Sequence, residues 1–534
     1  MMERQVMVRG RYPGLFRPMV LLSLLLMGSL QEARVPATPT AVLWAQAPDV
    51  AGLDAMVARA QGEWPVPGLA MVIVKDGQTV LMKGYGERLM GSGEQVDEHT
   101  LFAIASNSKA FTSAALAMLV EEGRLSWDDR VQEHLPYFQL YSPYVSHEMR
   151  IRDLLSHRSG LGTYSGDLLW YGTGYTAEEV VRRARYVPQA GAFRASYGYS
   201  NLMFIAAGEV VRAVSGKPWP EFVESRILAP LGMDRTVTST TDLAHRDNVA
   251  TPHKNWIGRT EPIEWYNWDA MAAAGGIISS VSDMARWLKL QLGHGESEGL
   301  RLFSEGSSWE MWTVHTARPV SAGSRASMPS THFRGYGLGW SLNDYLGRLI
   351  VSHGGGYDGM FSRVVLVPEE DLAVAVFTNS MTSISTAITN SVLDAYLGGE
   401  ERDWSEDLLL SWRSARLAFE ARQDRFQDER MEGTRPSLPM AGYTGRYGGP
   451  MYGDATVTEE NGGLVLRLLP NPDLVADLTH LHHDTFLIEW RKTSAWFGKG
   501  VATFALDPLG KVAEMKLDVP NDDLWFLELE MVKR

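Results

Sequence analysis

The 534-residue chain contains no cysteine. Disulfide bonds, thiolate zinc sites, iron-sulfur clusters, a cysteine nucleophile and a bacterial lipoprotein anchor are therefore excluded together. A nucleophile in this chain must be serine, threonine, lysine or a carboxylate.

Basic residues are fewer than acidic ones, with 50 lysines and arginines against 64 aspartates and glutamates, a net charge of -14. Surfaces that bind nucleic acids depend on clustered lysine and arginine, so we expect no nucleic-acid partner. With 45% hydrophobic and 21% charged residues, the chain can bury a large core and is long enough for more than one domain.

Residues 1–47 differ in composition from the rest of the chain. Four arginines precede a short apolar run from Met19 to Leu30, which is the charge order of a secretory signal, and the run is shorter than the ~20 residues that span a bilayer. We expect an export segment with a small-residue cleavage site at Ala45-Gln46-Ala47, and a periplasmic or extracellular protein. The alternative is an uncleaved anchor, which would then be the chain's membrane contact.

Residues 48–400 predict an α+β fold. Apolar and β-branched runs predict five strands, at residues 69–74, 79–85, 349–352, 361–367 and 372–378. The first two flank Asp76-Gly77, a pair suited to a tight hairpin turn. We therefore predict one antiparallel sheet built from N-terminal and C-terminal strands, flanked by helices, with a mostly helical inserted subdomain.

Helical patterns occupy the region between the early and late strands, at residues 106–122, 177–186, 202–215 and 283–293. The last three follow Thr176, Asn201 and Ser282, which we expect to act as N-caps.

The last part of the chain changes character twice. Residues 401–440 predict a helical linker: a charged amphipathic helix to residue 430, then a boundary with Gly433, Pro436 and Pro439. Residues 441–534 contain short alternating runs, which predict a small antiparallel, barrel-like β-domain. The runs are 456–458, 464–468, 485–490, 501–506 and 512–517.

The central chemical feature is Ser106-Asn107-Ser108-Lys109. Residues three apart lie on the same face of a helix, so the Lys109 amine can reach the Ser106 hydroxyl. A buried lysine with a depressed pKa can take the proton of a serine, and the N-H groups at a helix start can bind an oxyanion. A plain helix start remains the alternative for this motif by itself.

Two further motifs follow in the chain. Tyr199-Ser200-Asn201 ends a glycine-rich and aromatic loop, and its phenol and amide can relay protons and bind a carbonyl. His353-Gly354-Gly355-Gly356 is expected at the end of a strand, where glycines allow close approach of a substrate backbone. A packed tyrosine and an ordinary turn are the simpler readings of each motif alone.

Taken in order, these three motifs resemble those of the penicillin-recognising serine hydrolases, in the branch of class C β-lactamases, D-Ala-D-Ala carboxypeptidases and esterases. The resemblance covers roughly residues 50–395 and includes the stretches 154–161 (LLSHRSGL) and 274–277 (AGGI). The C-terminal domain resembles the lipocalin-like β-domain appended to some members. The family fold agrees with the predicted sheet and helical insert.

The resemblance implies a role for each motif residue. Ser106 would be the acylated nucleophile, with Lys109 and Tyr199 as general base and acid. The substrate would be bound by Asn201, His353, Gly354 and Gly355, and the backbone N-H groups of Ser106 and Gly356 would form the oxyanion hole. The mechanism needs no cofactor and no metal.

The substrate class stays open at this point. His353 stands where many β-lactamases carry a lysine that helps hold the β-lactam carboxylate, and an imidazole is only partly charged at neutral pH. Efficient β-lactamase activity is therefore not expected. We expect a serine hydrolase that cleaves amide or ester bonds of a small-molecule or peptide acyl substrate. The candidates are a D-amino-acid peptide hydrolase, a carboxylesterase and a weak β-lactamase. A non-catalytic binding or sensor protein is the rival from another class. The oligomeric state is not predicted.

Two other patterns are weaker. Lys492-Thr493-Ser494 resembles a Lys-Thr-Gly motif but lies in the C-terminal domain. His480, His482 and His483 beside Asp484 suggest a metal site only superficially, because no spaced partner ligand accompanies them.

Overall fold

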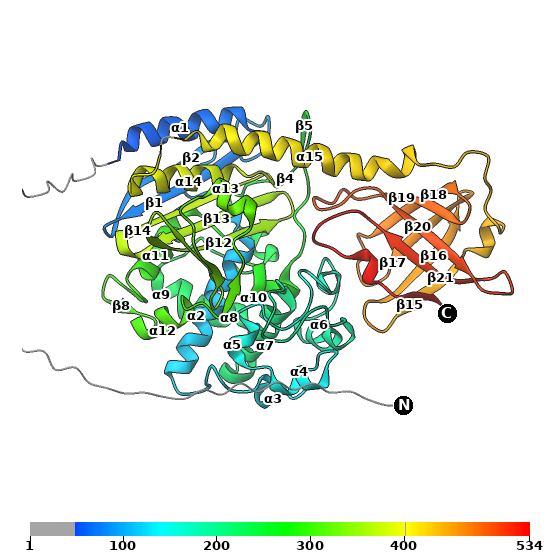
Figure 1. Cartoon of the computed structure of the whole chain (residues 1–534), viewed down its shortest axis with the longest axis horizontal. Coiled ribbons are helices and arrows are strands. Elements are labelled where there is room, and N and C mark those ends of the chain that lie inside the picture. Colours follow the sequence, from blue (N-terminus) through cyan, green and yellow to red (C-terminus); the bar gives the residue numbers. More distant parts are fainter. Residues whose placement is uncertain (1–47, 401) are drawn as a thin grey trace, which may run out of the picture. The chain divides into compact units, whose positions relative to one another are not determined.

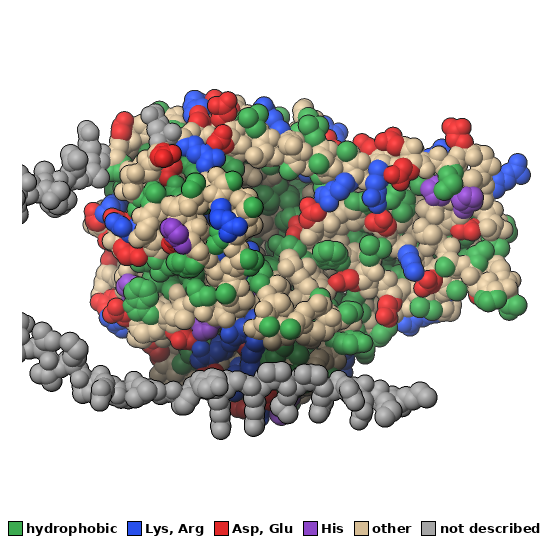
Figure 2. Space-filling model, in the orientation of Figure 1, with side chains coloured by type: hydrophobic (Ala, Val, Ile, Leu, Met, Phe, Trp, Pro, Cys, Tyr) green, Lys and Arg blue, Asp and Glu red, His purple; other side chains and the backbone are tan. Residues whose placement is uncertain are grey.

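The computed structural model describes residues 48–400 and 402–534, so the predicted export segment lies outside the described residues. Within the described part of the chain, no helix has both the length and the apolar character needed to cross a membrane. On the face drawn in Figure 2, acidic and basic side chains are interspersed over the surface.

An eight-stranded antiparallel sheet, with the strand order β2-β1-β14-β13-β12-β11-β10-β9, forms the centre of the first domain (Figure 1). Its strands are β1 (Gly68–Lys75), β2 (Gln78–Gly86), β9 (Thr316–Arg318), β10 (Arg334–Tyr336), β11 (Ser341–Tyr345), β12 (Arg348–Tyr357), β13 (Met360–Val367) and β14 (Leu372–Thr378). The first strand pairs with the last, with Leu69 opposite Thr378. The predicted sheet made from both ends of the domain is therefore confirmed.

The predicted hairpin at Asp76-Gly77 is present between β1 and β2. Both residues have positive φ, 51° and 69°, which is the backbone that a two-residue hairpin turn requires.

Helices cover both faces of the sheet (Figure 1). On one face lie α1 (Val50–Glu63), α14 (Ile384–Leu397) and α15 (Trp404–Asp428); on the other lie α2 (Ser108–Glu121) and α11 (Val281–Leu292). Strands β1, β13 and β14 alternate between these two faces, and their apolar side chains supply two separate cores. A sheet covered on both sides explains why these strands read as almost continuous apolar runs.

The inserted subdomain is mostly helical, as predicted. Its longest helix, α7 (Asn201–Ser215), packs against α2 and against α10 (Ala272–Gly275). The remaining short helices are α3 (Val131–His134), α4 (Pro143–Glu148), α5 (Ile151–Leu154), α6 (Ala177–Arg183), α8 (Trp219–Val223), α9 (Ala229–Leu231), α12 (Glu305–Met311) and α13 (Ala322–Ser327). Three two-stranded ladders pair β3 (Phe102–Ala103) with β6 (Ile278–Ser279), β4 (His253–Trp256) with β5 (Arg259–Pro262), and β7 (Glu296–Ser297) with β8 (Leu300–Arg301).

The C-terminal domain is a closed eight-stranded antiparallel barrel. Its strands are β15 (Gly445–Gly449), β16 (Gly453–Glu460), β17 (Gly463–Leu468), β18 (Val475–His482), β19 (Thr485–Trp490), β20 (Gly500–Leu506), β21 (Val512–Asp518) and β22 (Met531–Lys533). The barrel-like prediction is therefore confirmed, and closure by the β15–β22 pair leaves no unpaired edge strand.

Two of the three predicted N-caps are wrong. Thr176 caps α6 by accepting from the N-H of Glu179. Asn201 is instead the first residue of α7, and α11 is capped by Ser280 rather than Ser282.

The glycine run after His353 also differs from the prediction. It does not follow the strand but continues it, because β12 stays paired with β13 as far as Tyr357.

Candidate active site

Ser106 lies on a strained turn. It belongs to the 3-10 turn η1 (Ala105–Asn107), which leads directly into α2, whereas the sequence predicted a helix from Ser106 itself. Ala105 has φ 46°, a conformation that costs energy for a residue with a Cβ and is often found at functional sites. Asn107 fixes the turn by donating from Nδ2 to Ser362 Oγ at 2.8 Å.

Lys109 is buried one turn further on and makes three hydrogen bonds. Its Nζ lies 2.9 Å from Ser106 Oγ, 2.8 Å from Asn201 Oδ1 and 2.8 Å from the carbonyl oxygen of Ala274. The predicted meeting of Ser106 and Lys109 is thus present in the structure, and the 274–277 stretch supplies the third contact.

Burial lowers the pKa of Lys109 well below its ordinary value, while the charge of Asp167 partly opposes this effect. A neutral lysine has two N-H donors and one lone pair. Because Asn201 Oδ1 and the Ala274 carbonyl can only accept, they take the two hydrogens and leave the lone pair directed at Ser106 Oγ. The geometry therefore suits Lys109 as an acceptor of the serine proton.

Tyr199 closes the other side of this group. Its ring lies over Lys109, with Nζ 4.8 Å from the ring centroid, and it packs on His157 with the two ring centroids 4.1 Å apart. Burial raises the pKa of Tyr199 well above its ordinary value, although the Ser106 hydroxyl partly opposes this shift. Tyr199 is thus a neutral phenol, a donor rather than a phenolate base.

His157 belongs to the LLSHRSGL stretch and was not singled out from the sequence. It is fully buried, has φ 54°, and its Nδ1 accepts from the backbone N-H of Ser200 at 3.1 Å. Burial lowers its pKa well below the usual value, so it is a neutral ring that holds Tyr199 and the start of α7 in place.

Asp167 is a second residue that sequence reasoning missed. It accepts from Asn201 Nδ2 at 2.7 Å, which orients the amide so that Oδ1 faces Lys109. Burial raises the pKa of Asp167 to about 8. Its only sequence signal is its position six residues after the LLSHRSGL stretch, and that is too weak to identify it.

His353 is held as a neutral ring. Its Nδ1 lies 2.6 Å from the carbonyl oxygen of Gly354, so this nitrogen carries the proton and Nε2 accepts from Tyr336 at 2.8 Å. Burial, then the charge of Lys109, lower the pKa of His353 to about 3. The expectation of a partly charged imidazole is therefore wrong, because both the burial and the hydrogen bonds favour the neutral form.

The glycines of β12 let this strand pass close to the nucleophile. A Cβ on Gly355 would lie 2.1 Å from the carbonyl oxygen of Ile104, two residues before Ser106, whereas a Cβ on Gly354 would meet no atom nearer than 3.9 Å. Pairing with β11 ends at Ser352, so from His353 to Gly356 one edge of β12 pairs with no strand of the described residues. This edge borders the cavity that contains Ser106.

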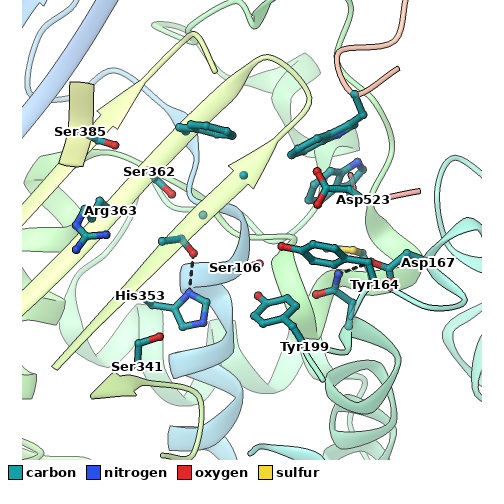
Figure 3. Close-up of a pocket in the computed structure, with 18 of the residues that line it drawn as sticks. Ser106, Tyr164, Asp167, Tyr199, Ser341, His353, Ser362, Arg363, Ser385 and Asp523 are labelled. Atoms are coloured by element: carbon teal, nitrogen blue, oxygen red, sulfur yellow. Dashed lines mark hydrogen bonds between the residues drawn. The ribbon is translucent and has the colours of Figure 1, made fainter. Parts of the chain in front are cut away.

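The cavity has a volume of about 450 Å³. Figure 3 shows Ser106, Tyr199 and His353 pointing toward its centre from three different elements. Ser106, Tyr199, Asn201, His353 and the three glycines all line it, so the structure brings every predicted site residue but the fully buried Lys109 to its wall.

Part of the cavity wall comes from the C-terminal barrel. Trp496, Asp523 and Leu524 line the same cavity as Ser106. Trp496 lies so close to β12 that a Cβ on Gly356 would be 3.0 Å from the tip of its ring.

The two weaker patterns lie outside this cavity. Lys492 forms ion pairs with Asp473 and Glu264, and Ser494 is a buried partner of Tyr171. His480 Nε2 donates to the carbonyl oxygen of His483 at 3.0 Å. Within residues 48–400 and 402–534, no group of three His, Asp or Glu side chains is arranged to hold a metal ion.

A family model described as Beta-lactamase matches residues 53–398. The chain belongs to the β-lactamase family. Residues 429–531, which include the barrel, match a second family model described as a domain of unknown function.

Several relatives of this β-lactamase-family chain are known. An unguisins hydrolase of Aspergillus campestris is 29% identical over 74% of this chain and 75% of its own. Penicillin-binding protein 4 of Amycolatopsis lactamdurans is 28% identical over 63% of this chain and 87% of its own.

The solved structures share the fold. The octameric penicillin-binding protein homologue from Pyrococcus abyssi superposes with a TM-score of 0.59 and 24% identity, covering 91% of this chain and all of its own. The family match over residues 53–398, together with these relatives, makes the chain a hydrolase of the penicillin-recognising serine hydrolase type.

Proposed function

We propose that this protein hydrolyses amide bonds of peptide-like substrates through an acyl-enzyme on Ser106. The observation that carries the proposal is the 2.9 Å contact between Lys109 Nζ and Ser106 Oγ, with the other two Lys109 contacts both made to acceptors. A serine becomes nucleophilic when a positioned base takes its proton.

The proposed reaction has two steps. Lys109 takes the Ser106 proton as Oγ attacks the substrate carbonyl carbon, and the resulting oxyanion is bound by the N-H groups of Ser106 and Gly356. Protonated Lys109, with Tyr199 as relay, returns the proton to the leaving nitrogen as the C-N bond breaks. Water then attacks the acyl-enzyme by the same route and restores Ser106.

The open edge of β12 supports a peptide-like substrate. An extended chain can pair with an exposed strand edge through main-chain hydrogen bonds, and this edge begins at His353, where the β11 pairing stops. Asn201 lines the same cavity, and its amide keeps one N-H and one lone pair with which to bind an amide in the acyl part of this substrate. The unguisins hydrolase and the penicillin-binding protein among the relatives are consistent with acyl hydrolysis of this kind.

Esters and β-lactams are the alternative substrate classes. Neutral His353 offers no charge to a β-lactam carboxylate, but Arg318 and Arg363 line the same cavity and neither forms an ion pair with an acid of the described residues. This observation keeps a weak β-lactamase activity as the second candidate.

The test is to trap the acyl-enzyme. The protein is mixed with D- and L-peptides, amides, esters and β-lactams, quenched in acid, digested and analysed by mass spectrometry. We expect an added acyl mass on the peptide that contains Ser106, largest for amide substrates. An enzyme that turns over none of these classes and never carries an acyl group would favour the non-catalytic sensor instead.

We also propose that the protein is exported through residues 1–47. Expression with this segment and cell fractionation tests the proposal, with the protein expected outside the cytoplasm and shortened at its N-terminus. Full-length protein retained in the cytoplasm would contradict export.

A further inference from the structure

Asp523 is the acidic residue that the barrel places in the active-site cavity. It lies in the loop between β21 and the 3-10 turn η9 (Phe526–Glu528) and lines the cavity together with Ser106. Figure 3 shows its carboxylate beside Tyr164, on the side of the cavity opposite Arg363.

The loop that carries Asp523 is fixed by one amide. Asn521 Nδ2 donates to the carbonyl oxygens of Val519 and Leu524 at 2.8 and 2.7 Å. Its Oδ1 accepts from the N-H groups of Asp523 and Leu524 at 3.0 and 2.5 Å. Because all four contacts are made to backbone groups within the loop, they fix the backbone position from which the Asp523 side chain enters the cavity.

The two neighbouring aspartates of this loop differ in their partners. Asp522 is exposed and accepts from Arg422 of α15 at 3.0 Å. The Asp523 carboxylate makes no hydrogen bond or ion pair with any described residue. Burial and the charge of Asp522 raise the pKa of Asp523 to about 7. A partly buried carboxylate without a donor is unfavourable unless a ligand supplies one.

The place of Asp523 relative to the catalytic group indicates which part of a substrate it meets. Its charge acts on Asp167, the hydrogen-bond partner of Asn201, and on Tyr164, whose ring packs on Tyr199. Arg363 lies at the other end, where its charge acts on His353, and the charge of Arg318 acts on both His353 and Tyr164. The cavity is therefore acidic on the Asn201 side of Ser106 and basic on the His353 side.

We infer that Asp523 binds a protonated amino group on the acyl residue of the substrate, so that the barrel selects peptides and amides with a free amino end. This inference rests on the proposed function, in which Asn201 contacts the acyl part. Tyr164, which lies beside Asp523 (Figure 3), supplies an aromatic surface at the same end, and an aromatic face suits a cation. A charge-assisted hydrogen bond in a partly desolvated site is strong enough to discriminate between amines and their acylated forms.

The test compares ligand pairs that differ only at the amino group. Alanine and phenylalanine amides of both configurations, each free and N-acetylated, are titrated by calorimetry into Ser106→Ala protein, which binds without turnover. We expect at least one free amide to bind more tightly than its N-acetyl form. Asp523→Asn should reduce the affinity for that free amide by about 10-fold or more and leave the N-acetyl form within about twofold.

Asp522→Asn is the matched control, since it removes the neighbouring charge without touching the cavity, and it should keep the preference. Equal affinity for free and acetylated amides, or equal losses for both in Asp523→Asn, would overturn the inference. Fluorophosphonate labelling of Asp523→Asn protein with Ser106 intact reports the nucleophile separately. If labelling fails in the wild type as well, the proposed function fails, while the binding result still decides the role of Asp523.

Discussion

The two walls of the active-site cavity differ in how their polar groups are satisfied. On the side of the β-lactamase-family domain, Asp167, Asn201 and the Lys109 buried behind the wall form a chain of hydrogen bonds of 2.7 to 2.9 Å that ends on Ser106. On the wall from the barrel, Asp523 has no partner among the described residues. Groups that must react are therefore preorganised, whereas a group that selects a ligand is left unpaired.

The difference has an energetic basis. Preorganised hydrogen bonds hold reacting groups in place and avoid reorganisation during the reaction. An unpaired, partly buried carboxylate lowers stability, and a ligand that donates to it recovers this cost. The family domain thus carries the chemistry, and the appended barrel carries selectivity on the same cavity.

The largest expected effect is the loss of the nucleophile. Ser106→Ala should reduce kcat/KM by about 10⁴-fold or more, because the acyl-enzyme cannot form, and should abolish fluorophosphonate labelling. Ser341→Ala is the matched control, since Ser341 lines the same cavity without contacting Lys109, and it should be labelled at the wild-type rate. A labelled Ser106→Ala protein would remove the assignment of the nucleophile.

The second-largest effect tests whether Lys109 acts as a base or only as a positive charge. Lys109→Arg introduces a permanent cation that cannot accept a proton, because a guanidinium stays protonated, so kcat should fall by about 10³-fold. Thermal unfolding of the variant checks that the fold survives. If Lys109→Arg kept a tenth or more of wild-type kcat, the lysine would act as a charge rather than as a base.

The arrangement of Ser106 and Lys109 could be predicted from the sequence because local backbone geometry determines it. The three-residue spacing of Ser106 and Lys109 places both on one face of a helix, and the Asp76-Gly77 hairpin follows from backbone preference. Both features depend on neighbours in the chain. The order of the motifs then identified the family.

The errors have a common physical origin in contacts between distant residues. Asn201 cannot cap α7, because Lys109 and Asp167 occupy its side-chain amide. The glycine run stays in β12 because β13 pairs with it. Asp523 could not be predicted at all, since nothing local to residues 519–524 indicates that this loop meets Ser106 from more than 400 positions away.

The third effect is a shift in pH dependence. Since Lys109 must be neutral to act, kcat/KM should rise with pH on the acidic side of the profile. The midpoint of this rising limb should lie well below the ordinary lysine pKa, because burial lowers the pKa of Lys109. The Asp167 charge favours protonated Lys109, so Asp167→Asn should move the limb to lower pH. A pH-rate profile of both proteins checks the direction, and a limb that moves upward or stays in place would contradict the assigned coupling.

The smallest effect concerns how the barrel is held against the family domain. Glu528 accepts from the Ser165 hydroxyl and from the N-H of Gly166 at 2.8 Å, close in the chain to Asp523. Glu528→Ala should lower the free energy of unfolding by about 1 to 3 kcal/mol, because it leaves buried donors without an acceptor. It should weaken the preference for free amino groups while fluorophosphonate labelling of Ser106 stays within about twofold.

Glu530→Ala is the control for that last variant, since Glu530 is exposed in the same segment and should change neither property. Urea denaturation measures the stability, and competition between free and acetylated amides measures the preference. If Glu528→Ala slowed labelling as much as it weakened the preference, the two walls would not be separable, because loosening the barrel would then disturb the chemistry as well. Labelling that survives while selectivity falls would show that the barrel acts on the substrate and not on Ser106.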